Sequence, residues 1–74
     1  MRIMYLNNHG AGFADFVNVE DNTTVQQFFS QQMPEKDPQD YLIRVNRQPV
    51  SKDYVLGEND RVTITPTKIE GAIL

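Results

Sequence analysis

The chain has 74 residues, no cysteine and a formal net charge of −3. This length leaves room for one small domain, which buries about 60% of the surface that its unfolded chain exposes. The lack of cysteine excludes disulfides, thiolate nucleophiles and Cys-ligated zinc, and it fits a reducing, cytoplasmic location. The negative charge disfavours nucleic acid as a partner and would steer a basic protein surface toward the chain. No stretch approaches the roughly 20 apolar residues that cross a bilayer, so we expect no contact with a membrane.

The N-terminal part of the chain predicts a β-hairpin. Residues 2–6 alternate, with Ile3 and Tyr5 on one face, and residues 16–20 alternate again. Residues 7–12 between them are rich in Asn and Gly, which accept the positive φ angles that chain reversals require. His9 lies in this turn without a visible catalytic or metal-binding partner, so we interpret it as a solvated turn residue.

A helix is predicted after this hairpin. Thr24 and Gln27 have the spacing of a capping box, in which each side chain satisfies a free backbone N–H group of the other residue. The residues that follow carry one apolar stripe at helical spacing, formed by Val25, Phe28, Phe29 and Met33. Pro34 ends the helix because the residue before a proline is biased away from helical geometry. The stripe predicts that Phe28 and Phe29 belong to the core rather than to a binding groove.

The second half of the chain predicts three further strands. Residues 34–40 form a polar connector, and residues 41–46 form a strand with Ile43 and Val45 facing inward. After a turn at 46–47, residues 48–50 predict a short edge strand. Pro49 lies in this segment, and proline cannot donate to a ladder.

The last predicted strand follows a long loop. Residues 51–59 form the loop, for which Val55 and Leu56 are the expected anchors. Residues 61–65 alternate, with Val62 and Ile64 facing inward.

This element order predicts an α+β fold of the ubiquitin-like β-grasp type. One helix packs on a mixed sheet of four to five strands, and the first and last strands are central and parallel. We expect a single domain over residues 1–70 and a C-terminal tail over residues 71–74. The expected edge strands are short, which favours a monomer.

Three segments resemble the ThiS/MoaD family of sulfur-carrier proteins. Residues 45–50 (VNRQPV) resemble its VNGxxV turn, residues 56–62 (LGENDRV) resemble its segment with a Gly-Asp pair, and Gly71-Ala72 falls where the family carries a terminal Gly-Gly. The resemblance implies a small carrier or ubiquitin-like modifier with no cofactor of its own. An ATP-dependent activating enzyme would adenylate its C-terminal carboxylate, and a sulfur donor would convert that group to a thiocarboxylate. The implied working residues are Gly71 and Ala72.

The chain departs from this family in three places. Arg47 stands at the position of the turn glycine, where a positive φ would cost up to about 1 kcal/mol, and Asn59 replaces the glycine of the Gly-Asp pair. Ala72 replaces the second terminal glycine, and residues 73–74 follow it. A glycine tail can thread a narrow channel, whereas a branched C-terminus hinders access to ATP. The resemblance therefore implies either trimming of the tail or a diverged function.

The outward face of the predicted sheet offers an alternative function. Alternation places Met4, Leu6, Phe16, Leu42 and Arg44 on this face, with Arg2 and Arg61 nearby. Apolar residues rimmed by arginine are typical of a protein-recognition surface. The alternative hypothesis is a ubiquitin-like interaction module that is never conjugated and binds an unidentified protein through this face.

Independent catalysis and metal binding are not predicted. The sequence offers no Ser–His or Cys–His arrangement, so we do not expect an enzyme. Gly10 and Gly12 lack the lysine and the following helix of a phosphate-binding loop. The carboxylates of Asp53, Glu58 and Asp60 lie in one loop, and we interpret them as solvated because no calcium-binding pattern surrounds them. The sequence leaves open which pathway a carrier of this kind would serve.

Overall fold

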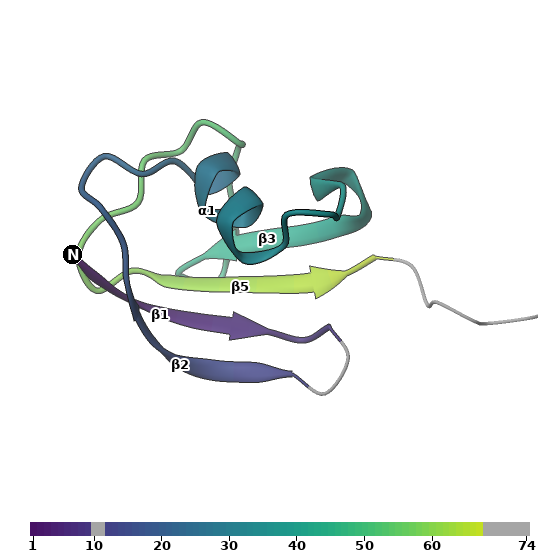
Figure 1. Ribbon diagram of the computed structural model, residues 1–74, viewed down its shortest axis with the longest axis horizontal. Coiled ribbons are helices and arrows are strands. Elements are labelled where there is room, and N and C mark those ends of the chain that lie inside the picture. Colours follow the sequence, from purple (N-terminus) through teal and green to yellow (C-terminus); the bar gives the residue numbers. More distant parts are fainter. Residues whose placement is uncertain (10–11, 68–74) are drawn as a thin grey trace, which may run out of the picture.

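The protein folds into two layers, a helix on a five-stranded sheet (Figure 1). The computed structural model describes residues 1–9 and 12–67. Its elements are β1 (Arg2–Asn7), β2 (Phe13–Asn18), α1 (Val25–Gln32), a 3₁₀ helix η1 (Pro38–Asp40), β3 (Tyr41–Val45), β4 (Gln48–Pro49) and β5 (Arg61–Pro66). The strand order is β2-β1-β5-β3-β4, and β1 pairs with β5 in parallel while the other pairs are antiparallel. The predicted α+β arrangement with parallel central strands is confirmed.

Strand β2 begins earlier than the alternation predicted. It covers Phe13–Asn18 instead of residues 16–20, and its register pairs Phe13 with Asn7 directly beside the turn. Gly12 adopts a φ of 83°, which lets the chain reverse close to the ladder. Residues 13–15 lack an alternating apolar pattern, yet the backbone of β1 pairs with them. β2 is therefore a six-residue edge strand, longer than the edge strands expected from the sequence.

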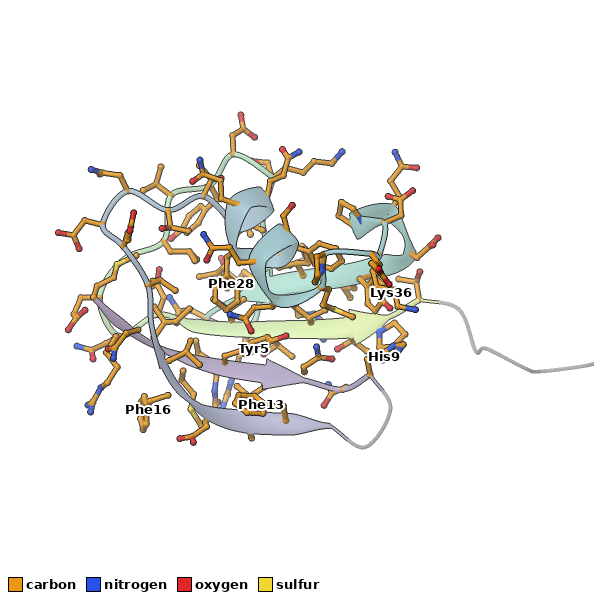
Figure 2. The ribbon with its side chains drawn as sticks, in the orientation of Figure 1. Tyr5, His9, Phe13, Phe16, Phe28 and Lys36 are labelled. Carbon is orange, nitrogen blue, oxygen red and sulfur yellow. The ribbon has the colours of Figure 1, made fainter. Side chains whose placement is uncertain are left out.

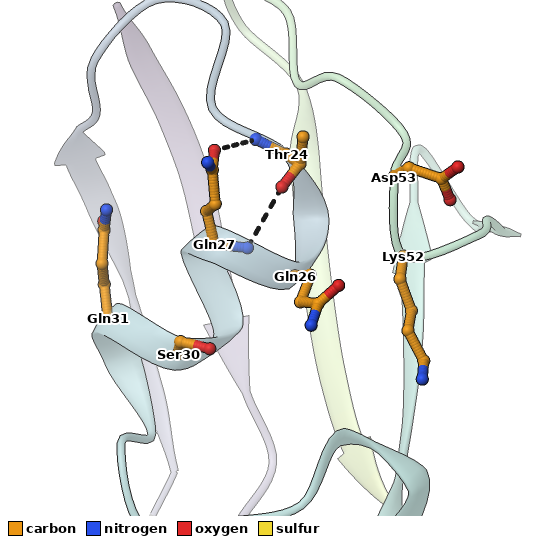
Figure 3. Close-up of a pocket in the computed structure, with 7 residues that line it drawn as sticks. All are labelled: Thr24, Gln26, Gln27, Ser30, Gln31, Lys52 and Asp53. Atoms are coloured by element: carbon orange, nitrogen blue, oxygen red, sulfur yellow. Dashed lines mark hydrogen bonds between the residues drawn. The ribbon is translucent and has the colours of Figure 1, made fainter.

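Helix α1 begins at the predicted capping box (Figure 3). The hydroxyl of Thr24 accepts a hydrogen bond from the Gln27 backbone N–H at 3.2 Å, and the Gln27 side-chain oxygen accepts one from the Thr24 N–H at 2.9 Å. The helix ends at Gln32, and Met33 caps it with non-helical φ and ψ of −136° and 68°. This ending agrees with the restriction that Pro34 imposes on Met33. Within the described residues, no helix is long and apolar enough to cross a membrane.

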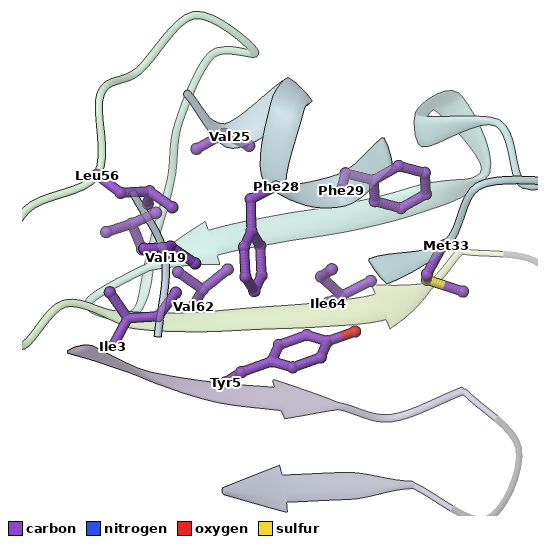
Figure 4. Close-up of a cluster of buried hydrophobic side chains, with 11 residues drawn as sticks. Ile3, Tyr5, Val19, Val25, Phe28, Phe29, Met33, Leu56, Val62 and Ile64 are labelled. Atoms are coloured by element: carbon purple, nitrogen blue, oxygen red, sulfur yellow. The ribbon is translucent and has the colours of Figure 1, made fainter. Parts of the chain in front are cut away.

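The core lies between α1 and the inner face of the sheet (Figure 4). The ring of Phe28 descends from the helix onto the central strands and meets the Tyr5 ring edge-on, with centroids 5.0 Å apart and planes at 88°. The predicted inward residues of β1 and β5 are buried, and Ile43 is only partly buried against this core. Core members are Ile3, Tyr5, Val19, Val25, Phe28, Phe29, Met33, Val45, Leu56, Val62 and Ile64.

The loop between β4 and β5 is anchored differently from the prediction. Leu56 is buried as expected, whereas Val55 is 52% exposed, so its side chain does not anchor the loop. Backbone hydrogen bonds take that role, because Val25 N–H donates to the Tyr54 carbonyl and Leu56 N–H donates to the Thr23 carbonyl, both at 2.9 Å. These bonds tie the loop to the start of α1.

The turn between β3 and β4 adopts a left-handed backbone conformation. Asn46 and Arg47 have φ angles of 53° and 73°, and Asn59 in the loop before β5 has a φ of 66°. Positive φ at both central residues is typical of a type I′ hairpin turn, which favours Asn-Gly. Asn tolerates this region well, but arginine carries a Cβ penalty there.

We expect Arg47→Gly to raise the free energy of unfolding by about 0.5–1 kcal/mol, because glycine removes the Cβ penalty at this φ angle. Urea unfolding with an unchanged m-value measures this gain. Arg47→Ala is the matched control, since it removes the charge and keeps the Cβ atom. An equal gain in both variants would show that the arginine side chain, and not the backbone conformation, limits stability.

Candidate functional site

The outer face of the sheet, opposite α1, is the candidate site. The strand registers place Phe16 of β2, Met4 of β1 and Arg61 of β5 opposite one another, so their side chains form a row across three strands. A second row contains Ala14, Leu6, Thr63, Arg44 and Pro49. The predicted face therefore exists as a surface that combines apolar and basic side chains.

The predicted apolar residues of this face form two separate groups. Met4 lies opposite Phe16, and Leu6 is the next outward residue of β1, so these three form one group, which we call the apolar cluster. Leu42 of β3 lies opposite Thr65 of β5, so the central strand β5 separates Leu42 from the apolar cluster. Alternation predicts which face a residue occupies, but it does not predict the lateral order of strands.

Phe16 is the most exposed member of the apolar cluster, at 51%. The guanidinium carbon of Arg2 lies 4.4 Å from the centre of its ring, which is the geometry of a cation–π contact. The backbone N–H of Arg2 donates to a carboxylate oxygen of Glu58 at 2.7 Å. Arg2 therefore sits over an exposed aromatic ring while its own backbone is tied to the loop before β5.

The sequence did not indicate a second exposed aromatic residue, Phe13. It is 49% exposed, and its ring contacts Tyr5 with centroids 5.4 Å apart, so it lies on the inner side of β2, away from Phe16 (Figure 2). The prediction placed Phe13 before the strand, where no alternation marked its orientation. Its nearly equal exposure on the other side of the same strand makes it a matched control for Phe16.

His9 is not the solvated turn residue that the sequence suggested. It is half-buried, its Nδ1 atom lies 3.1 Å from the Tyr41 hydroxyl, and the two ring centroids are 5.7 Å apart. The Tyr41 ring packs in turn on Phe29, at 5.4 Å between centroids. His9 therefore connects the first turn to β3. In the described part of the chain, no three His, Cys, Asp or Glu side chains are grouped to hold a metal ion.

Two carboxylates that we interpreted as solvated have structural partners. One Glu58 oxygen accepts the Arg2 N–H, while the two oxygens of Asp60 accept from Gly57 N–H at 2.7 Å and from the Asn46 side-chain amide at 2.9 Å. The Asn46 side-chain oxygen accepts from Arg61 N–H at 3.0 Å. Asp60 thus joins the β3–β4 turn to the start of β5, a role that loop spacing alone did not indicate.

Two shallow grooves flank α1. One, of about 500 Å³, lies beside the start of the helix and is lined mainly by amide and hydroxyl side chains with Lys52 and Asp53 (Figure 3). The other, of about 370 Å³, lies near the helix end between Asn7, His9 and residues 32–36. Beside the second groove, the Asn7 amide donates to the Tyr5 hydroxyl at 2.7 Å. Burial raises the pKa of this Tyr5 hydroxyl, and the hydrogen bond from Asn7 opposes that rise.

Comparison with known proteins addresses the fold. No family model and no curated protein matches the chain. Among solved structures, the chain is similar to one described as a ubiquitin-like protein from the hyperthermophilic archaea Caldiarchaeum subterraneum, with a TM-score of 0.68 and 14% sequence identity. The match covers 93% of this chain and 99% of that chain. This chain therefore has the ubiquitin-like β-grasp fold. At this level of identity the likeness concerns the fold alone.

The end of β5 is fixed to the body of this ubiquitin-like fold. Thr67 donates two hydrogen bonds to the Asp40 carbonyl, from its N–H at 2.9 Å and from its hydroxyl at 3.0 Å. The predicted tail residues Gly71 and Ala72 lie outside the described residues. These bonds hold Thr67, the residue directly after β5, against η1.

Proposed function

We propose that this chain is a small carrier or modifier protein of the ubiquitin-like type, which acts through its C-terminal tail. The observation that carries the proposal is the position of residues 68–74 in the sequence, because they follow β5, the central strand of a ubiquitin-like sheet. The motifs at residues 45–50 and 56–62 and the pair Gly71-Ala72 resemble the ThiS/MoaD sulfur carriers. The positive φ angles at Arg47 and Asn59 support this resemblance, because glycine is favoured at such positions.

The chemistry proposed for the tail is carboxylate activation. An ATP-dependent enzyme would join the terminal carboxylate to AMP and release pyrophosphate, and a sulfur donor would then displace AMP to leave a thiocarboxylate. The branched side chains of Ile73 and Leu74 hinder entry into a narrow channel, whereas a chain that ends at Ala72 carries only one small side chain after Gly71. We therefore propose that the active form ends at Ala72. This form would need no cofactor of its own.

The tail proposal predicts different behaviour for the full and the shortened chain. With ATP and the activating enzyme of its own host, the chain that ends at Ala72 should support pyrophosphate exchange, while the chain that ends at Leu74 should not. Intact mass of the protein isolated from that host should show loss of Ile73-Leu74 or replacement of an oxygen by sulfur. A full-length, unmodified protein together with no exchange by either form would contradict the proposal.

A second candidate is a ubiquitin-like interaction module that binds a protein partner through the outer sheet face. The contact of Arg2 with the exposed Phe16 ring favours it, since an aromatic ring in an apolar cluster beside arginine is typical of a binding hot spot. The two candidates use different parts of the chain. An activating enzyme that docks on the face and draws in the tail would require both.

Phe16→Asp tests the interaction module, because it places a charge in the apolar cluster. We expect the variant to lose the host proteins that the wild-type chain retains in a pull-down experiment, and Leu6→Asp to behave in the same way. The control Phe13→Asp alters a ring of similar exposure on the other side of β2 and should retain them. Circular dichroism verifies that each variant is folded. Equal retention by Phe16→Asp and Phe13→Asp would contradict binding through the outer face.

A further inference from the structure

The outer sheet face carries a charge opposite to that of the whole chain. Arg2 of β1, Arg61 of β5 and Arg44 of β3 occupy outward strand positions, and all three are exposed. The other outward strand positions are Met4, Leu6, Ala14, Phe16, Asn18, Leu42, Pro49, Thr63 and Thr65, and none of them is acidic. The net charge of −3 therefore comes from acidic residues placed elsewhere.

Within the described residues, no ion pair is seen for the arginines of this face. Among residues 1–9 and 12–67, the one ion pair within 4.0 Å joins the Met1 amino group to Asp21 at 3.6 Å. Glu58 and Asp60 belong to the loop before β5, close to Arg2 and Arg61, and their oxygens accept hydrogen bonds from backbone and amide groups. The Arg2 guanidinium contacts the Phe16 ring, and Arg44 and Arg61 have exposed side chains that a ligand can reach.

The arrangement of these groups defines the kind of ligand that fits. Met4 lies between Phe16 and Arg61, and Arg2 covers the Phe16 ring. Adjacent strands are about 4.8 Å apart, so the backbones at Arg61 and Phe16, which lie two strands apart, are separated by about 10 Å, with Met4 between them. A ligand with one carboxylate on each side of an apolar residue could contact Arg2 with one carboxylate and Arg61 with the other. Its apolar residue would then cover Met4.

We propose that the outer sheet face binds an acidic segment of a partner protein, in which carboxylates flank an apolar side chain. This inference rests on the second candidate function, binding through the outer face, and it names the chemistry of the partner. It differs from the expectation from net charge that a basic surface would be steered toward the chain, because the local sign decides close contact. Arginine suits this role, since its planar group forms bidentate hydrogen bonds with carboxylates.

A protein segment fits this face better than a nucleic acid. A long polyanion would gain contacts with three arginines while approaching a chain of net charge −3, and nucleic-acid surfaces usually carry an excess of basic residues. The apolar cluster between the arginines also offers no hydrogen bonds to a phosphate backbone. An aliphatic side chain on a partner protein would instead bury this surface.

The test uses the full chain labelled with nitrogen-15 and a synthetic peptide in which single leucines alternate with pairs of glutamates. We expect amide shifts on titration to concentrate at Arg2, Met4, Phe16 and Arg61, and to weaken as salt increases. Arg61→Glu should bind the peptide about tenfold more weakly, because it removes one ion pair and adds repulsion. The matched control Arg47→Glu makes the same charge change in the β3–β4 turn and should bind like the wild-type chain.

Other outcomes of this titration overturn the inference. One is a glutamine peptide that binds as well as the glutamate peptide. Another is an oligothymidylate that binds more tightly than the glutamate peptide. A third is a change of the amide shifts on dilution of the protein alone, which would indicate self-association through the face. Equal weakening by Arg47→Glu and Arg61→Glu would show an effect of net charge only. If Phe16→Asp abolishes retention of host proteins but the glutamate peptide does not bind, the interaction module stands and the acidic chemistry fails.

Discussion

The parallel pairing of β1 with β5 is the constraint on which the rest of this structure depends. It brings residues from the two ends of the described chain together, with Met4 N–H donating to the Asp60 carbonyl and Asn8 N–H donating to the Ile64 carbonyl, both at 2.9 Å. Non-local pairing of this kind costs loop-closure entropy, which burial of the helix stripe on the paired strands offsets. Phe28 lies at the centre of this burial, against Tyr5 of β1.

The same pairing creates the candidate binding face. Because β1 and β5 are adjacent, the outward residues Met4 and Arg61 lie side by side, and β2 adds Phe16 to the same row. A sheet with another strand order would keep each residue on its face and separate these groups. The inner side of the pair supplies the core, while its outer side combines an apolar cluster with exposed arginines.

Local rules predicted much of the fold from sequence. The capping box at Thr24, the stop at Pro34 and the inward alternation of Val62 and Ile64 are each confirmed, since each depends on residues close in the chain. The prediction was wrong where distant contacts decide. Backbone pairing with β1 extends β2 to Phe13, and backbone bonds to the segment before α1 hold the loop at Val55 while its side chain stays exposed.

The candidate site was predicted only in part for the same reason. Alternation identified the outward residues, but the register separates Leu42 from the apolar cluster and brings Arg61 beside Met4. The partners of His9 and Asp60 depend on contacts between distant segments, so spacing gave no signal for them. Net charge led us to expect a basic partner, whereas the acidic partner that we propose follows from the placement of three arginines on one face.

Scalar couplings across hydrogen bonds test the central pairing most directly. In protein labelled with both nitrogen-15 and carbon-13, we expect couplings from the Met4 amide nitrogen to the Asp60 carbonyl carbon and from the Asn8 amide nitrogen to the Ile64 carbonyl carbon. Both couplings together establish that β1 and β5 lie side by side in parallel. Coupling of these amides to any other carbonyls would contradict the strand order, and with it the core and the candidate binding face that we describe.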